Sequence, residues 1–374
     1  MKHAGKIISF SIILVAVTIL ASIMNFGEAR AIDAESYIQL SYFIQGKDGQ
    51  LIEHFAARPL VPALASLFNN FFDINTSFGI VNTIFLCLTS IFLFLLFSRL
   101  FNNIKLGFLA ALFFPLSFPI ILLGSQVLTD AAGYFFLILA IYFIEFHLSK
   151  LNMKNFLLSG LIVALALLAR DSSIIILIYL ALTILINRHK YMKRKFSLIY
   201  KFFLTFIIAI LPFSIWKYIT NVKSYPIIER ISSTTDKIFT LRYFFSAIIR
   251  SILSFHILWL PAIYGLFIDN DKNRRQYYYK ILLTVLPLMI IAYLTLAQNY
   301  NYDLRHTFTL FPLIFPLAAY ALTSIDSRLK TRNIITISFI ILYVIISFIG
   351  ASLVPDTPIR NSLIDINFLE TFFK

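Results

Sequence analysis

The side chains that could do chemistry in this sequence are few, and most lie in short polar segments between long apolar runs. Asp33 and Glu35 stand near the start of the longest polar segment, which also holds Tyr37, His54 and Arg58. A carboxylate can act as a general base, and an arginine binds anions through its planar fork of N–H groups. The candidates in later segments are Asp130, Arg170, Asp171, Arg250, Arg305 and His306.

The composition limits the class of protein that carries these residues. Of the 374 residues, 59% are hydrophobic and only 13% are charged. A water-soluble domain of this size needs a charged exterior, and a disordered chain has few apolar residues, so both classes are excluded. The sequence therefore predicts an all-α polytopic membrane protein, with residues 1–374 forming a single transmembrane domain.

The apolar runs predict about eleven transmembrane helices. A helix needs about 20 apolar residues to cross a bilayer. The predicted spans are 7–24, 79–98, 106–124, 131–147, 156–169, 174–187, 202–216, 246–267, 281–297, 307–323 and 334–353. The third span is interrupted by Pro115 and Pro119, and the two short runs of 156–187 form a hairpin with Arg170 and Asp171 at its tip.

The charged residues predict how these spans are oriented. With the N-terminus in the cytoplasm, the inside segments carry 19 of the 32 Lys and Arg residues, and 14 of the 18 acidic residues fall outside. This asymmetry follows the positive-inside rule and accounts for the net charge of +14 without a nucleic-acid partner. The protein is expected in the cytoplasmic membrane, with a first extracytoplasmic loop at 25–78, a second at 217–245 and a tail at 354–374.

The first loop is predicted to carry two helices along the membrane surface. Asp33 suits the position before a helix that begins at Ala34, and Pro59 suits the first turn of a second helix. These polar groups also have structural interpretations. Asp33 could serve only as a helix cap, Arg170 and Asp171 could pair with each other, and Arg250 could extend to lipid headgroups.

Four stretches resemble motifs of the GT-C superfamily of integral-membrane glycosyltransferases, of the protein mannosyltransferase or aminoarabinose transferase type. Asp33-Ala34-Glu35-Ser36-Tyr37 is similar to the acidic motif of the first outside loop, and Arg58-Pro59-Leu60-Val61-Pro62 to the Arg-Pro segment that closes it. Leu128-Thr129-Asp130-Ala131 resembles the acidic turn before the fourth span. Arg305-His306 resembles a late Arg-aromatic motif, with His306 in place of the aromatic residue. The likeness covers residues 7–323 by topology.

The resemblance implies transfer of a sugar from a polyprenyl-phosphate carrier to a lipid, glycan or protein acceptor at the outer face. The carrier phosphate is a good leaving group, so one carboxylate acting as base suffices, and in-line attack would invert the anomeric centre. Asp33 is the expected base, with Glu35 and Asp130 as alternatives. A divalent cation, if one is used, would be held by Asp33 and Asp130.

The resemblance also implies an arginine that stabilises the charge on the leaving phosphate. Arg305 is the first expectation, followed by Arg58, Arg170 and Arg250. The further site candidates are Tyr37, His54, Asp171 and His306.

Two other functions fit parts of the sequence. A polysaccharide polymerase or ligase would use a lipid-diphosphate donor and arginines in larger outside loops, for which 217–245 is short. A lipid or sugar transporter or flippase would place charged groups near the bilayer midplane, whereas most polar residues here lie at the outer rim.

Overall fold

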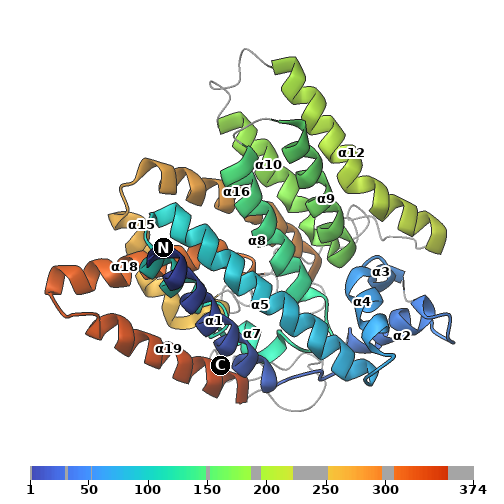
Figure 1. Ribbon diagram of the computed structural model, residues 1–374, viewed down its shortest axis with the longest axis horizontal. Helices are drawn as coiled ribbons and strands as arrows, with labels where there is room; N and C mark the ends of the chain where they lie inside the picture. Colours follow the sequence, from blue (N-terminus) through green and yellow to red (C-terminus); the bar gives the residue numbers. More distant parts are fainter. Residues whose placement is uncertain are drawn as a thin grey trace, which may run out of the picture.

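A computed structural model describes residues 2–29, 33–51, 53–148, 152–186, 195–221, 252–296 and 307–352, and the regular structure in these ranges is helical (Figure 1). The predicted all-α fold class is therefore confirmed. Five helices are long and apolar enough to cross a membrane. They are α1 (Lys2–Ile23), α5 (Ile74–Phe101), α8 (Asp130–His147), α12 (Lys195–Thr220) and α19 (Ile334–Ser352).

Most of the other predicted spans also coincide with helices. They are α9 (Met153–Ala169), α10 (Ile175–Ile186), α15 (Trp259–Ile268), α16 (Lys272–Leu296) and α18 (Phe311–Leu329). A 3-10 turn, η2 (Asp171–Ile174), precedes α10, and another, η4 (His256–Leu258), precedes α15. The predicted turn at Arg170 and Asp171 thus lies between two helices, as expected.

The predicted span 106–124 is instead two short helices, α6 (Ile104–Leu112) and α7 (Phe118–Leu123). Pro115 lies between them, and a proline inside a helix removes a hydrogen bond and clashes with the preceding turn. Pro119 falls in the first turn of α7, where the ring is tolerated. The prolines therefore divide this span completely.

The bundle is built around α5, which packs against α1, α6 and α8 (Figure 1). Helix α9 lies between α8 and α12, and α15 packs along α18. Aromatic rings fill the centre: Phe308 lies 5.4 Å from Tyr134 and 5.6 Å from Phe255, measured between ring centroids. These contacts join α8 to the segments that precede α15 and α18.

The outer surface of the bundle is apolar. Large aliphatic and aromatic side chains are exposed along α1, α12 and α19, among them Ile12, Leu20, Phe203, Leu211 and Ile341. Exposed apolar surface on this scale is stable only in a lipid environment. The chain is an integral membrane protein, as its composition predicts.

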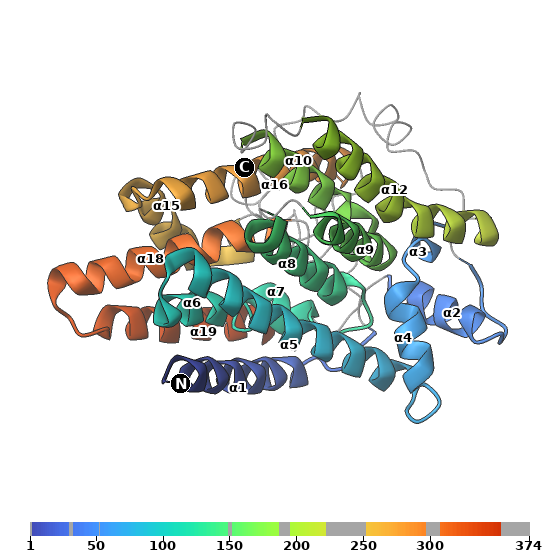
Figure 2. The ribbon, with the colours of Figure 1, turned by 45° about the horizontal axis from the view of Figure 1, so that its top comes forward.

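Three short helices, α2 (Ala34–Ile44), α3 (Glu53–Ala56) and α4 (Leu60–Phe68), gather at one end of the bundle (Figure 2). Both predicted starts are confirmed: α2 begins at Ala34 and α4 directly after Pro59. Two bonds fasten α2 to α4, because Ser41 Oγ donates to the Pro62 carbonyl at 2.9 Å and Gln45 Nε2 donates to the Ser66 carbonyl at 2.8 Å.

The opposite end of the bundle carries the N-terminus and the α18–α19 turn (Figure 2). A buried ion pair between Glu145 of α8 and Lys280 of α16 lies in this half, and Tyr179 of α10 donates to the same Glu145 oxygen at 2.7 Å. The helices in the middle of the bundle are therefore fixed to one another by charge as well as by packing.

Candidate active site

Helix α2 presents Asp33 and Tyr37 at its first turn. Asp33 occupies the position before the first helical residue, but its side chain makes no capping hydrogen bond. Its carboxylate lies close enough to the Arg58 guanidinium for the two charges to interact. Tyr37 is 1% exposed, and its ring meets Phe55 edge-on with centroids 5.5 Å apart. The Asp33 carboxylate is therefore not used to start the helix, and Tyr37 is rigidly held beside it.

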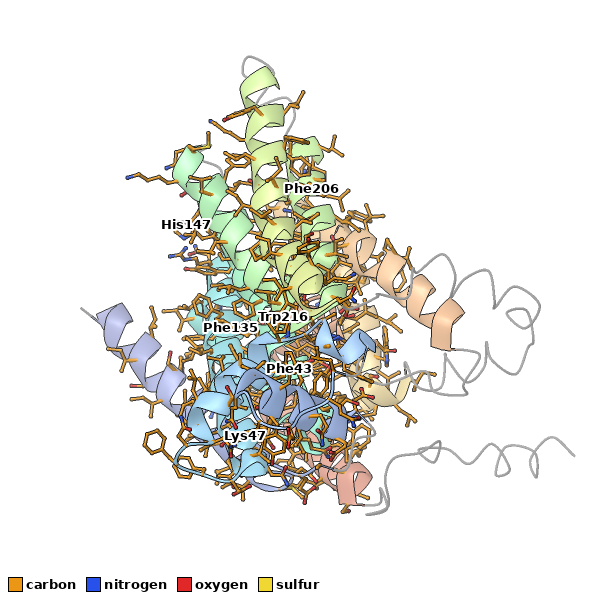
Figure 3. All side chains as sticks on the ribbon, turned by 90° about the vertical axis from the view of Figure 1, so that its right-hand side faces the viewer. Phe43, Lys47, Phe135, His147, Phe206 and Trp216 are labelled. Carbon is orange, nitrogen blue, oxygen red and sulfur yellow. The ribbon has the colours of Figure 1, made fainter. Side chains whose placement is uncertain are left out.

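Arg58 lies between α3 and α4 and joins three segments. Its Nε and Nη2 atoms lie 3.0 and 2.9 Å from Oδ1 of Asp171, and its Nη1 donates to the Tyr37 hydroxyl at 2.8 Å. Trp216 near the end of α12 fixes the preceding turn, because its indole N–H donates to the Ala56 carbonyl at 2.7 Å (Figure 3). The Arg58 guanidinium is consequently held against both α2 and η2.

A second ion pair lies beside the first. Asp130, the first residue of α8, pairs with Arg170 at the end of α9, and both side chains are buried. Helix α8 leaves room for the arginine at Gly133, where a Cβ atom would come within 3.1 Å of Arg170 Cδ. Thr129, next to Asp130, donates weakly to the Tyr37 hydroxyl at 3.4 Å.

Adjacent residues Arg170 and Asp171 thus have different partners. Arg170 pairs with Asp130 and Asp171 with Arg58, so the interpretation in which they pair only with each other is wrong. The cause is local geometry: Arg170 is extended, with φ −157° and ψ 121°, and a 3-10 turn follows at once. Neighbouring side chains in such a stretch point to different sides of the backbone.

The loop before α8 is braced from two directions. Asn82 of α5 donates its amide to the carbonyls of Gln126 and Leu128, at 2.6 and 3.0 Å. Gly27 after α1 donates its N–H to Ser125 at 3.1 Å and has φ +67°. A Cβ atom at Gly27 would lie 2.7 Å from the Asn75 carbonyl oxygen, so only glycine fits there. This bracing fixes where α8, and with it Asp130, begins.

Electrostatics keep the Arg58–Asp171 pair ionised. Burial opposes the charge on Arg58, but Asp171 and then Tyr37 and Asp33 raise its pKa above the usual range. Burial alone would also raise the pKa of Asp171, yet Arg58 and Arg170 lower it below its ordinary value. The result is a continuous set of charged contacts contributed by α2, the α3–α4 turn, η2 and α8.

The comparisons with known proteins point to one superfamily. Residues 57–216 match the family model described as dolichyl-phosphate-mannose-protein mannosyltransferase. The fold is similar to the crystal structure of the Archaeoglobus fulgidus oligosaccharyltransferase in complex with Zn and sulfate, with a TM-score of 0.50 and 14% sequence identity. Both findings support the resemblance to the GT-C superfamily of membrane glycosyltransferases. The aligned region covers 94% of this chain and 52% of the archaeal one, so the chain spans about half that protein's length. A search of curated protein sequences gives no match.

Several predicted site residues lie apart from this cluster or outside the described residues. Glu35 is exposed, and its carboxylate accepts a hydrogen bond from Gln39 at 2.7 Å. Three candidates lie outside the described residues, namely Arg250, Arg305 and His306. The side chain of His54 is also outside the described part. The described site therefore rests on Asp33, Tyr37, Arg58, Asp130, Arg170 and Asp171.

The described carboxylates do not form a metal centre by themselves. Within the described ranges, no group of three or more His, Cys, Asp or Glu side chains converges on a point that a metal ion could occupy. Asp130, one of the two predicted ligands, is already neutralised by Arg170. That Asp33 and Asp130 would hold a divalent cation stays a prediction.

Two residues that position the site could have been found in the sequence. Asn82 is an amide within an otherwise apolar span, and polar residues at membrane depth usually have a specific partner. Trp216 carries an N–H group near a predicted span end, where indoles commonly sit at the interface. Their partners, which are backbone carbonyls far away in sequence, could not be found this way.

Proposed function

We propose that this protein transfers a sugar from a polyprenyl-phosphate carrier to an acceptor hydroxyl at the outer face of the cytoplasmic membrane. The observation that carries the proposal is the placement of a carboxylate, Asp33, at the start of α2, whose residue Tyr37 is hydrogen-bonded to an arginine, Arg58. Arg58 and the ion pair of Asp130 lie inside the region that matches a family of lipid-phosphate-sugar-dependent transferases.

In this mechanism Asp33 is the general base. It accepts the proton of the acceptor hydroxyl as the oxygen attacks the anomeric carbon of the sugar. The bond from that carbon to the carrier phosphate breaks, and the phosphate leaves with the electron pair. In-line attack inverts the anomeric configuration, so a product with retained configuration would contradict this part of the mechanism. Glu35 remains the alternative base, although its carboxylate is exposed and engages Gln39.

Arg58 is the phosphate-binding group among the described residues. A guanidinium stabilises the negative charge that accumulates on the leaving phosphate, and its N–H groups match two phosphate oxygens. The buried Arg170 is neutralised by Asp130 and acts as a support for η2. Arg305 and Arg250 are proposed as further phosphate contacts from segments outside the described residues. No step is assigned to a metal ion.

The outward orientation is supported by the charge distribution. The site lies at the end that carries α2–α4, while the opposite end carries the α5–α6 and α18–α19 turns (Figure 2). In the sequence these two segments hold Arg99 and Lys105, and Arg328, Lys330 and Arg332. By the positive-inside rule those segments face the cytoplasm. An acceptor would then reach Asp33 from outside, and the donor would arrive from the surrounding lipid.

The test is native mass spectrometry of the lipids that co-purify with the protein in mild detergent. A polyprenyl monophosphate, bare or carrying one sugar, is the expected result, and its mass would identify the donor sugar class. A diphosphate-linked oligosaccharide would instead favour a polymerase or ligase. A transporter would be favoured by a different result with added polyprenyl-phosphate sugar. In that case the protein would move the donor across vesicle membranes but form no glycosylated product with any lipid, glycan or peptide acceptor.

A further inference from the structure

Asp171 occupies the face of Arg58 on which an anionic substrate would bind. Its Oδ1 atom lies within 3.0 Å of both Nε and Nη2 of the guanidinium. These two donors form the edge with which an arginine grips a carboxylate or phosphate bidentately. The third donor, Nη1, bonds to the Tyr37 hydroxyl instead. Among the described residues, Asp171 is therefore the partner of the Nε–Nη2 edge.

The Arg58–Asp171 contact is also the weaker of the two neighbouring ion pairs. A single Asp171 oxygen accepts both Arg58 donors. The Asp171 side chain is 48% exposed, against 6% for Asp130 in its pair with Arg170. A partly exposed ion pair contributes little free energy, whereas a buried one is difficult to separate. Asp171 is therefore the carboxylate that can leave its arginine.

Charge balance favours an exchange over simple addition. Asp171 pairs with Arg58 and Asp130 pairs with Arg170, so each of the two guanidinium groups already has a carboxylate against it. A phosphodiester added to this cluster would meet an excess of negative charge. A phosphodiester that replaces Asp171 on Arg58, while Asp171 turns to solvent, leaves the charge around Arg58 unchanged.

We propose that Asp171 is a specificity-determining residue that holds the anion position of Arg58 until the carrier phosphate of the donor displaces it, and that returns to expel the phosphate product. This inference rests on the proposed function, since it requires an anionic lipid at Arg58. It adds a role for Asp171 in both donor entry and product release. The product phosphate carries more negative charge than the donor phosphodiester. Its release from Arg58 therefore depends most on competition from Asp171.

The experiment compares binding of farnesyl phosphate and uncharged farnesol to the purified protein in detergent. The test variant is Asp171→Asn, which keeps the oxygen that accepts the Ser172 N–H at 3.1 Å but loses the charge. Farnesyl phosphate should bind the variant about five-fold more tightly than the wild type, as expected when an exposed ion pair no longer competes. Farnesol should bind both equally, and Asp171→Glu should behave like the wild type.

The outcomes separate this inference from the proposed function. If the wild type binds farnesyl phosphate no better than farnesol, both proposals fail. If the wild type discriminates but Asp171→Asn binds the phosphate equally or more weakly, Asp171 only holds Arg58 in place and this inference alone is wrong. Should Asp171→Asn fail to fold, Asp171→Ala is measured in its place, and binding weaker than wild type again overturns the inference. In turnover assays, the phosphate product should inhibit Asp171→Asn more strongly than it inhibits the wild type.

Discussion

The indole nitrogen of Trp216 lies 2.7 Å from the carbonyl oxygen of Ala56, which joins the end of α12 to the turn that carries Arg58. This hydrogen bond, between residues 160 positions apart, thus helps to position Arg58, the arginine proposed to bind phosphate. Because Trp216 is at the end of a membrane helix, the position of Arg58 depends on how α12 is seated in the bundle.

Replacing Trp216 by Phe should weaken donor binding more than the chemical step. The change removes one donor and leaves the Ala56 carbonyl without it, a loss of about 1 kcal/mol, or roughly five-fold. We expect KM for the donor to rise by about that factor with kcat nearly unchanged. Tyr218→Phe is the matched control, because Tyr218 is on the same helix and 89% exposed. Equal effects of the two substitutions would contradict a specific role for the Trp216 bond.

Replacing Asp33 by Asn should remove transfer without unfolding the protein. Loss of a general base lowers the rate by about 10²–10⁴-fold. The melting temperature should change little, because the Asp33 side chain makes no capping bond to α2 and asparagine has nearly the same size and shape. Steady-state transfer and thermal unfolding in detergent measure the two effects. Glu35→Gln tests the alternative base: a large loss of rate there, with Asp33→Asn active, would move the base to Glu35.

Breaking the buried ion pair at the start of α8 should destabilise the fold. Asp130→Asn leaves the Arg170 charge buried without its counter-ion, which costs about 3–5 kcal/mol in comparable pairs. The double variant Asp130→Asn/Arg170→Met should recover part of this loss, since it removes both charges. Asp271→Asn is the control, because Asp271 is an exposed partner of Arg274 and such pairs contribute about 1 kcal/mol or less. Thermal unfolding gives all three values, and a double variant less stable than the single one would refute the charge argument.

The Arg58–Asp171 pair predicts a defined pH dependence of stability. The folded protein lowers the pKa of Asp171, so the pair's stabilisation is fully present above the ordinary aspartate pKa of about 3.9. It is lost only as the pH falls through the lowered pKa. The difference in melting temperature between wild type and Asp171→Asn should therefore stay constant from pH 8 to about pH 4 and shrink below it. A difference that already disappears between pH 7 and pH 5 would show that the pKa of Asp171 is raised instead.

The parts of the fold that depend on local sequence signals were predictable. A helix starting at Ala34, another starting after Pro59 and a turn at Arg170 all follow from residue type and apolar spacing, and the structure confirms them. One boundary differs because a helix cap lies outside the apolar run. Helix α5 begins at Ile74, inside the predicted loop 25–78, because Asp73 caps it by accepting from the Thr76 N–H at 3.0 Å.

Pairings between distant segments were not predictable from one sequence. Arg58 and Asp171 are 113 residues apart. In the sequence Asp171 stands next to Arg170, which is an equally good partner by residue type. Only the placement of η2 against the α3–α4 turn decides between Arg58 and Arg170. The individual roles of Asp33, Glu35 and the arginines stay predictions, to be decided by the variants above.

The contacts between α2 and α4 bear on how the chain can be divided. The region 57–216 that matches the family model leaves out Asp33 and Tyr37, so that region alone holds four of the six residues of the described site. A polypeptide cut within the 46–51 segment would yield two inactive pieces. Because Ser41 and Gln45 bind α4 directly, the two pieces should reassemble when produced together, and activity would return by complementation.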